Sequence, residues 1–137
     1  MVRNFRRQIR SLALVFAFLD EFYRFDNVSD ENRYSITFVI EELFTNMVKY
    51  NPHSPTDIRI TLHKDKQKII IEIVDHAEKP FDVTQHHEVD TTRRLEERTP
   101  GGLGIHLTRK LMDEICYDFS NGTSTTTLTK YLGKNNV

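Results

Sequence analysis

Residues 41–51 carry a carboxylate and an amide at a spacing that could support chemistry. Glu42 and Asn46 are four residues apart, so a helix places them together on one edge, whereas Glu41 projects to the far side. An acceptor-only carboxylate beside an amide, at the border of a core, suits a proton-abstracting base next to a metal or phosphate ligand. The alternative is a boundary pair that hydrogen-bonds neighbouring backbone, because helices often place such pairs there.

A further carboxylate lies at the end of a predicted strand. Ile69, Ile71 and Ile73 share one face of this strand, and the two-residue period points Asp75 the same way, toward the core. A buried carboxylate requires a donor, either from the backbone or from a ligand. The alternative is an ordinary aspartate in a turn after the strand.

Residues 77–100 have almost no apolar periodicity, and Gly101, Gly102, Leu103 and Gly104 follow them. A loop of this length is usually functional or disordered, and we expect a lid over a site. Glycines that run into a helix N-terminus let backbone N–H groups close on an anion. A flexible hinge would have the same sequence.

Periodicity also predicts the elements that must position these residues. We expect helices over about 6–25, from the turn and N-cap residues at 26–30 to about 51, and from about 102 onward. We expect strands over 58–62, 68–74, 116–120 and 123–132. The second helix has one apolar stripe: Ile36, Val39, Ile40, Leu43, Phe44, Met47 and Val48. Helices followed by hairpins predict an α+β two-layer sandwich, with the helices on one face of a mixed, mostly antiparallel sheet.

Apolar side chains on the other two helices extend this predicted core. The first helix has one stripe and a second apolar set: Ile9, Leu12, Phe16, Leu19 and Tyr23, then Leu14, Val15, Phe18 and Phe22. Burial on two sides would explain both, and a dimer or partner surface is the alternative. The third helix is predicted to have one stripe: Leu107, Leu111, Met112 and Ile115.

The composition predicts one domain over residues 1–137. Of these residues 38% are hydrophobic and 28% charged, and the formal net charge is -1, which favours neither nucleic acid nor an anionic membrane as a partner. The single Cys116 excludes an internal disulfide, and we expect it to be small and buried. A solvated helix face would explain the basic residues near the N-terminus: Arg3, Arg6, Arg7 and Arg10. No membrane-spanning run or signal-peptide pattern is present, so we expect a cytoplasmic protein.

Together these motifs resemble one family over about residues 5–132. They are Glu42-x-x-x-Asn46, Asp75 at a strand end, Pro80-Phe81-Asp82, Gly102-Leu103-Gly104 opening a helix, and Leu128-Thr129-Lys130. The chain resembles the anti-sigma factor serine kinases of sporulation and stress response, within the GHKL (histidine-kinase-like) ATPase superfamily and its Bergerat fold. Residues 101–114 are especially similar to that family.

The resemblance implies ATP and Mg2+ as cofactors and a role for each residue. Asn46 would hold Mg2+, Asp75 would accept the adenine amino group, and Glu42 would be the general base. The backbone at Gly102, Leu103 and Gly104 would reach the phosphates. Ser124 or Thr126 would complete the adenine contact, and the strand register leaves this choice open.

The resemblance also implies partners and an activity. The chain would be a protein serine/threonine kinase that phosphorylates a STAS-domain anti-anti-sigma protein and sequesters a sigma factor, with a homodimer as a further possibility. The alternative is a catalytically silent nucleotide- and partner-binding module. A metal-dependent hydrolase that uses the histidines is a third interpretation, but no spacing in the chain resembles a known metal site.

Two features depart from the family pattern. Ala77 stands where relatives have a glycine near the adenine, so its methyl group could crowd the base. Relatives usually begin with a strand before the first helix, whereas this chain is expected to start almost at that helix, so the sheet edge is expected to be missing or supplied otherwise.

Overall fold

The computed structural model describes residues 1–76 and 102–133. The elements in chain order are β1 (Val2–Phe5), the 3-10 helix η1 (Ile9–Ser11), α1 (Leu12–Phe25), α2 (Asp30–Tyr50), β2 (Ile58–Lys64), β3 (Lys68–His76), α3 (Gly102–Leu111), β4 (Glu114–Ser120) and β5 (Thr123–Tyr131). Among these residues, no helix is long and apolar enough to cross a membrane.

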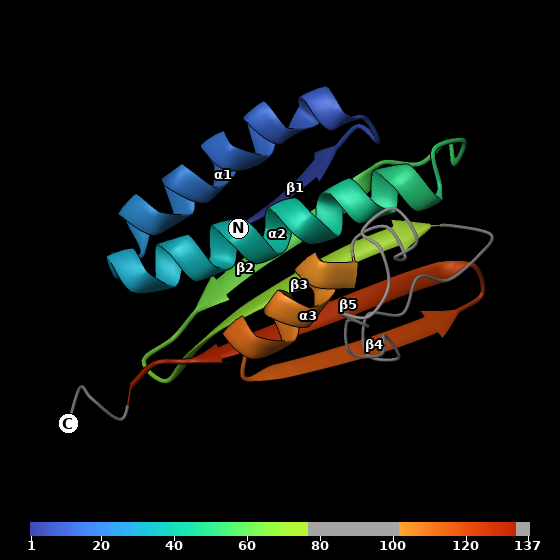
Figure 1. Cartoon of the computed structure of the whole chain (residues 1–137). Helices are drawn as coiled ribbons and strands as arrows, with labels where there is room; N and C mark the ends of the chain where they lie inside the picture. The colour runs from blue at the N-terminus through green and yellow to red at the C-terminus, as the bar shows by residue number, and fades with distance from the viewer. Residues whose placement is uncertain (77–101, 134–137) are drawn as a thin grey trace.

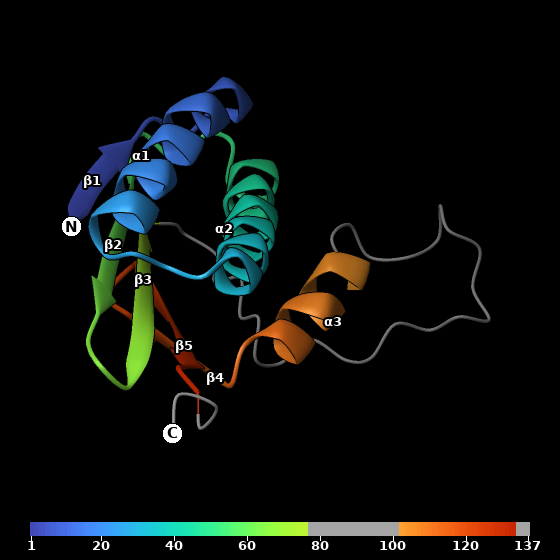
Figure 2. The ribbon, with the colours of Figure 1, turned by 90° about the vertical axis from the view of Figure 1, so that its left-hand side faces the viewer.

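The five strands form one sheet in the order β1-β2-β3-β5-β4, and every described pairing is antiparallel. The three α-helices lie on one face of this sheet, with α2 between α1 and α3 (Figure 1, Figure 2). The predicted α+β two-layer architecture is therefore confirmed.

The core lies between α1, α2 and the inner face of the sheet. The stripe predicted for α2 is buried, apart from Val48, which is partly buried. Alternate residues of β2 and β3 face this stripe: Ile58, Ile60, Leu62, Ile69, Ile71 and Ile73, each at most 1% exposed. Ser29 caps the start of α2 by accepting from the backbone N–H of Asn32 at 3.4 Å. This core fixes the position of α2 over β3.

The N-terminal region differs from our prediction in two ways. The edge strand β1 is present and pairs with β2, although only its last residue, Phe5, is buried. Four residues with one inward side chain are too short to produce a periodic pattern. The long helix begins at Leu12 instead of Arg6, after the 3-10 turn. Phe5 packs on Phe18 and Phe44, with ring centroids 5.7 and 6.4 Å apart, which ties β1 to both helices.

The buried face of α1 also differs from the predicted stripe. The fully buried residues are Val15, Phe18, Leu19, Phe22 and Tyr23, so the helix turns a neighbouring face inward. Ile9 and Leu14 are exposed, by 47% and 65%. The buried face takes Val15, Phe18 and Phe22 from the second apolar set and Leu19 and Tyr23 from the first, so packing against α2 and Phe5 selects a face that spans both sets.

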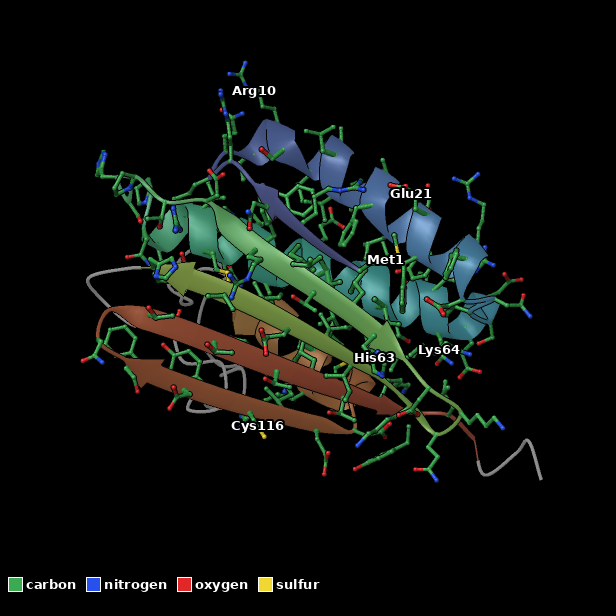
Figure 3. The ribbon with its side chains drawn as sticks, turned by 180° about the vertical axis from the view of Figure 1, so that it is seen from behind. Met1, Arg10, Glu21, His63, Lys64 and Cys116 are labelled. Atoms are coloured by element: carbon green, nitrogen blue, oxygen red, sulfur yellow. The ribbon has the colours of Figure 1, made fainter. Side chains whose placement is uncertain are left out.

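Two predictions near the C-terminus are wrong. Cys116 is exposed, because it lies on the outer face of the edge strand β4 (Figure 3). Helix α3 ends at Leu111, so Met112 and Ile115 are not part of a helical stripe, and Leu107 is 37% exposed. Among the α3 side chains that the structure describes, residues 106–111, Thr108 is the fully buried one.

The hairpin predicted at Asn121 and Gly122 is confirmed. Both residues have positive φ, 54° and 77°, as a two-residue turn requires. This turn joins β4 to β5, and β5 in turn pairs with β3, the central strand, in a register that runs from Lys68 opposite Tyr131 to His76 opposite Thr123. The register decides which β5 side chains lie beside Asp75.

Candidate functional site

Asp75 lies near the end of β3 and is 2% exposed. Its Cα partner on β5 is Ser124, and the Ser124 hydroxyl donates to the Asp75 backbone carbonyl at 3.2 Å. Thr126 is also buried but lies opposite Ile73, one inward position farther along. Of the two hydroxyl residues left open by the sequence, Ser124 is therefore the one directly beside Asp75.

The donor that the buried Asp75 carboxylate requires is Arg7. The Arg7 guanidinium forms an ion pair with Asp75 Oδ1, and both side chains are only 3% exposed. The interpretation of Arg7 as part of a solvated helix face was therefore wrong. Sequence periodicity could not reveal this, because Arg7 precedes the helix and its partner is 68 residues away. The only signal in the sequence was that Asp75 needed a donor.

The same guanidinium also contacts two backbone carbonyls. Arg7 Nη1 donates to Met47 O at 3.3 Å, and Arg7 Nη2 donates to His76 O at 3.4 Å. Met47 is in the last turn of α2, directly after Asn46. Arg7 therefore connects the residues after β1, the end of α2 and the end of β3.

Asn46 is 1% exposed on α2. Its side-chain Nδ2 has no hydrogen-bond partner among the residues that the structure describes. A buried amide left without a partner costs about 1–3 kcal/mol in general, so it requires an explanation. A ligand that uses this amide would provide one.

Glu42 lies one helical turn before Asn46 and is half-buried, whereas Glu41 is exposed, as predicted. Burial raises the pKa of the Glu42 carboxyl, Lys49 opposes this rise, and Glu41 adds to it. A raised pKa strengthens a carboxylate as a base, which suits proton abstraction near neutral pH. In this arrangement Glu42 could accept a proton and Asn46 could hold a charged ligand.

The carbonyl of His76 anchors the last residue of β3. It accepts from Ser54 Oγ at 2.6 Å and from Thr56 Oγ1 at 3.3 Å, in addition to Arg7. The His76 ring Nδ1 lies 2.9 Å from Thr123 Oγ1 on β5. The strand end that presents Asp75 is thus held on both sides.

Several predicted site residues cannot be compared with the structure. Ala77 and the expected lid at 77–100 lie outside the described residues, as does Gly101. Helix α3 begins at Gly102, as the glycine cluster indicated, but only its backbone is described at Gly102, Leu103 and Gly104.

The residues present fit the groups that the sequence implied. Asn46 supplies in Oδ1 an oxygen of the kind that Mg2+ prefers, and its Nδ2, which lacks a described partner, could donate to a phosphate oxygen. Asp75 supplies a buried acceptor for a base amino group, with the Ser124 hydroxyl beside it. Within the described residues, no group of three or more His, Cys, Asp or Glu side chains could hold a metal ion.

Comparisons with known proteins show the family and the fold to which the chain is similar. The family described as "Histidine kinase-like ATPase domain" matches residues 5–130. The chain is 29% identical over 108 residues to "Serine/threonine-protein kinase BtrW" of Bordetella bronchiseptica, covering 77% of this chain and 75% of that protein. A chain in the crystal structure of the SiaB-SiaC complex from Pseudomonas aeruginosa superposes with a TM-score of 0.61 at 10% identity. That match covers 96% of this chain and 89% of the other, and it shows likeness of fold.

Proposed function

The chain belongs to the histidine kinase-like ATPase domain family, and on that premise we propose that it is an ATP-dependent protein serine kinase that switches a partner protein. Its substrate would be a serine of a STAS-domain anti-anti-sigma protein, and its second partner would be a sigma factor that it sequesters. The observation that carries the proposal is one helix with a half-buried carboxylate of raised pKa and, one turn later, a buried orphaned amide. The similarity to a protein named as a serine/threonine kinase supports it.

Each residue of the site has a role in this proposal. Asp75 accepts the adenine amino group with the Ser124 hydroxyl beside it, and Asn46 holds Mg2+. Bound Mg2+ would neutralise charge on the phosphates during transfer. The backbone at Gly102, Leu103 and Gly104 contacts the phosphates at the start of α3.

Glu42 acts on the protein substrate. Its carboxylate takes the proton of the attacking serine hydroxyl, the serine oxygen bonds to the γ-phosphorus, and the bond from that phosphorus to the β,γ-bridging oxygen breaks. The products are phosphoserine and ADP. A buried Glu42 is a better base than an exposed one, because its carboxylate holds a proton more strongly.

Transfer of labelled phosphate from ATP to a purified STAS-domain protein from the same genome tests this proposal. We expect Glu42→Gln to lower the transfer rate by about 10²–10⁴-fold, the usual contribution of a general base, while Mg2+-ATP still binds. Glu41→Gln is the matched control, because Glu41 is the exposed neighbour on the same helix. It removes only a minor cause of the raised Glu42 pKa, so it should change the rate far less than Glu42→Gln does.

Two other outcomes would change the proposal. Equal rates for wild type and Glu42→Gln would exclude Glu42 as the base. Tight Mg2+-ATP binding by the wild type with no transfer to any STAS-domain protein of that genome would instead favour the silent nucleotide- and partner-binding module.

A further inference from the structure

The ion pair between Arg7 and Asp75 occupies the carboxylate that the proposed function assigns to the adenine amino group. Asp75 is on β3, the central strand, and Arg7 follows β1, the edge strand on the α1 side of the sheet. Ser124 is on β5, which lies on the other side of β3. Asp75 is therefore flanked by a cation from one side of the sheet and a hydroxyl residue from the other.

Arg7 and the proposed phosphate contacts come from different elements. Helix α2 lies between α1 and α3 (Figure 2). The Arg7 guanidinium contacts the carbonyl of Met47 at the end of α2. The glycines proposed to contact the phosphates open α3. Arg7 thus reaches Asp75 from the segment between β1 and α1, whereas the proposed phosphate contacts lie at the start of α3.

One carboxylate can serve both groups. An ionised carboxylate has about four acceptor positions, and the ion pair uses Oδ1. A carboxylate paired with a guanidinium is held in place by that pair, and its oxygens accept hydrogen bonds and cannot donate them.

We propose that Arg7 is a positioning residue that selects the nucleobase: its ion pair fixes the Asp75 carboxylate in place, so the site takes a base with an amino group and rejects one with a carbonyl at that position. The inference rests on the proposed function, because it requires Asp75 to contact the base. Adenine carries the amino group, and hypoxanthine carries a carbonyl at the same place. Arg7 itself does not contact the nucleotide.

Titration of the full chain with ATP and with ITP, both with Mg2+, tests this inference. We expect the wild type to bind ATP about 100-fold more tightly than ITP, because ITP places a carbonyl against the carboxylate. In Arg7→Met the ratio should fall about tenfold or more, mainly through weaker ATP binding. Arg7→Lys keeps the charge and should restore part of the ratio.

Two further variants make the test decisive. Arg6→Met is the matched control, because Arg6 is the exposed neighbour and should keep the wild-type ratio. If Arg7→Met does not fold, the double variant Arg7→Met with Asp75→Asn removes both charges. The side-chain amide introduced at position 75 can accept or donate a hydrogen bond. We expect this double variant to bind ATP and ITP within about threefold of each other.

The outcomes separate the inference from the proposed function. An unchanged ATP to ITP ratio in Arg7→Met overturns the role of Arg7 and leaves nucleotide binding intact. An unchanged ratio in the double variant overturns the inference and also the assignment of Asp75 to the base. Tighter ATP binding by Arg7→Met also overturns it, because Arg7 would then compete with the base for Asp75. If the wild type binds neither nucleotide, the proposed function fails and the inference fails with it.

Discussion

The polar side chains near the two ends of α2, on the helix and on neighbouring elements, differ in their burial and hydrogen bonding. At the N-terminal end, exposed or partly exposed side chains satisfy nearby backbone groups. Ser29 caps the helix, Asp65 Oδ1 accepts from the N–H groups of Gln67 and Lys68 at 2.7 and 2.9 Å, and Asp113 Oδ2 accepts from Tyr131 N–H at 2.6 Å. These contacts explain local turns and require no ligand.

At the C-terminal end the polar groups are buried and their hydrogen bonding is incomplete. Asp75 and Arg7 pair with each other, yet Arg7 Nε and Asn46 Nδ2 have no partner within the described part of the chain. A buried polar group without a full set of partners lowers stability. A protein therefore gains little from such a group unless the group binds something. The difference teaches that orphaned buried groups, rather than polar residues in general, mark the site.

The largest difference between the two ends should appear when one charge is removed. Arg7→Met leaves Asp75 buried without its cation, so we expect the free energy of unfolding to fall by about 3–5 kcal/mol. Lys66→Met, an exposed substitution at the other end, should change it by less than about 0.5 kcal/mol. Urea unfolding measures both values. Similar values for the two variants would mean that the buried pair is not energetically special.

Removing the orphaned amide should separate stability from binding. Asn46→Leu replaces an amide whose Nδ2 lacks a described partner, so we expect the free energy of unfolding to stay the same or rise by about 1 kcal/mol. Binding of Mg2+-ATP should be lost in the same variant. A large loss of stability with normal nucleotide binding would show that Asn46 is a structural residue.

Removal of the helix cap should lower stability and leave nucleotide binding unchanged, the reverse of the result expected for Asn46→Leu. Ser29→Ala removes the acceptor for the Asn32 N–H and should lower the free energy of unfolding by about 1 kcal/mol. Nucleotide affinity should not change, because the cap is at the far end of α2. Thermal unfolding and calorimetric titration measure the two effects. A changed affinity would mean that the two ends are coupled.

The smallest expected effects concern the pH dependence of stability, to which Glu42 and Asp65 contribute through pKa shifts in opposite directions. Burial raises the pKa of Glu42, so stability falls as pH rises through its titration, and Glu42→Gln should remove that fall and slightly raise the melting temperature at neutral pH. The backbone N–H groups of Gln67 and Lys68 lower the pKa of Asp65, so its contribution is present above the ordinary aspartate pKa and is lost as pH falls. Melting temperatures of Glu42→Gln and Asp65→Asn between about pH 3 and 8 test both signs.

The rate of phosphoryl transfer should rise with pH over the range in which deprotonation of Glu42 lowers stability. A general base works only when deprotonated, so phosphoryl transfer should rise with pH through a value above that of an ordinary glutamate. A rate that does not vary with pH in this range would contradict the assignment.

The sequence predicted the fold well where a long periodic pattern of apolar residues marked one face of a helix or strand. The apolar stripe of α2 and the alternation of β2 and β3 were sufficient to place the central layer. Local patterns failed where tertiary contacts decide. β1 has one buried side chain, and the face of α1 was ambiguous between two apolar sets.

The candidate site was predictable in part for the same reason. Asp75 followed from the strand period, and its burial was correctly expected. Ser124 could be distinguished from Thr126 only by the register against β3. Arg7 could not be found, because an ion pair across 68 residues leaves no periodic signal. Long-range pairing was the information missing from the sequence.

The most direct test of the central claim is calorimetric titration of the wild type with ATP, with and without Mg2+, beside Asp75→Asn and Asn46→Ala. We predict that the wild type binds ATP, that Asp75→Asn loses most of this binding, and that the binding left in Asn46→Ala no longer depends on Mg2+. Equal, Mg2+-dependent binding by all three proteins, or no binding by the wild type, would contradict the assignment of this site.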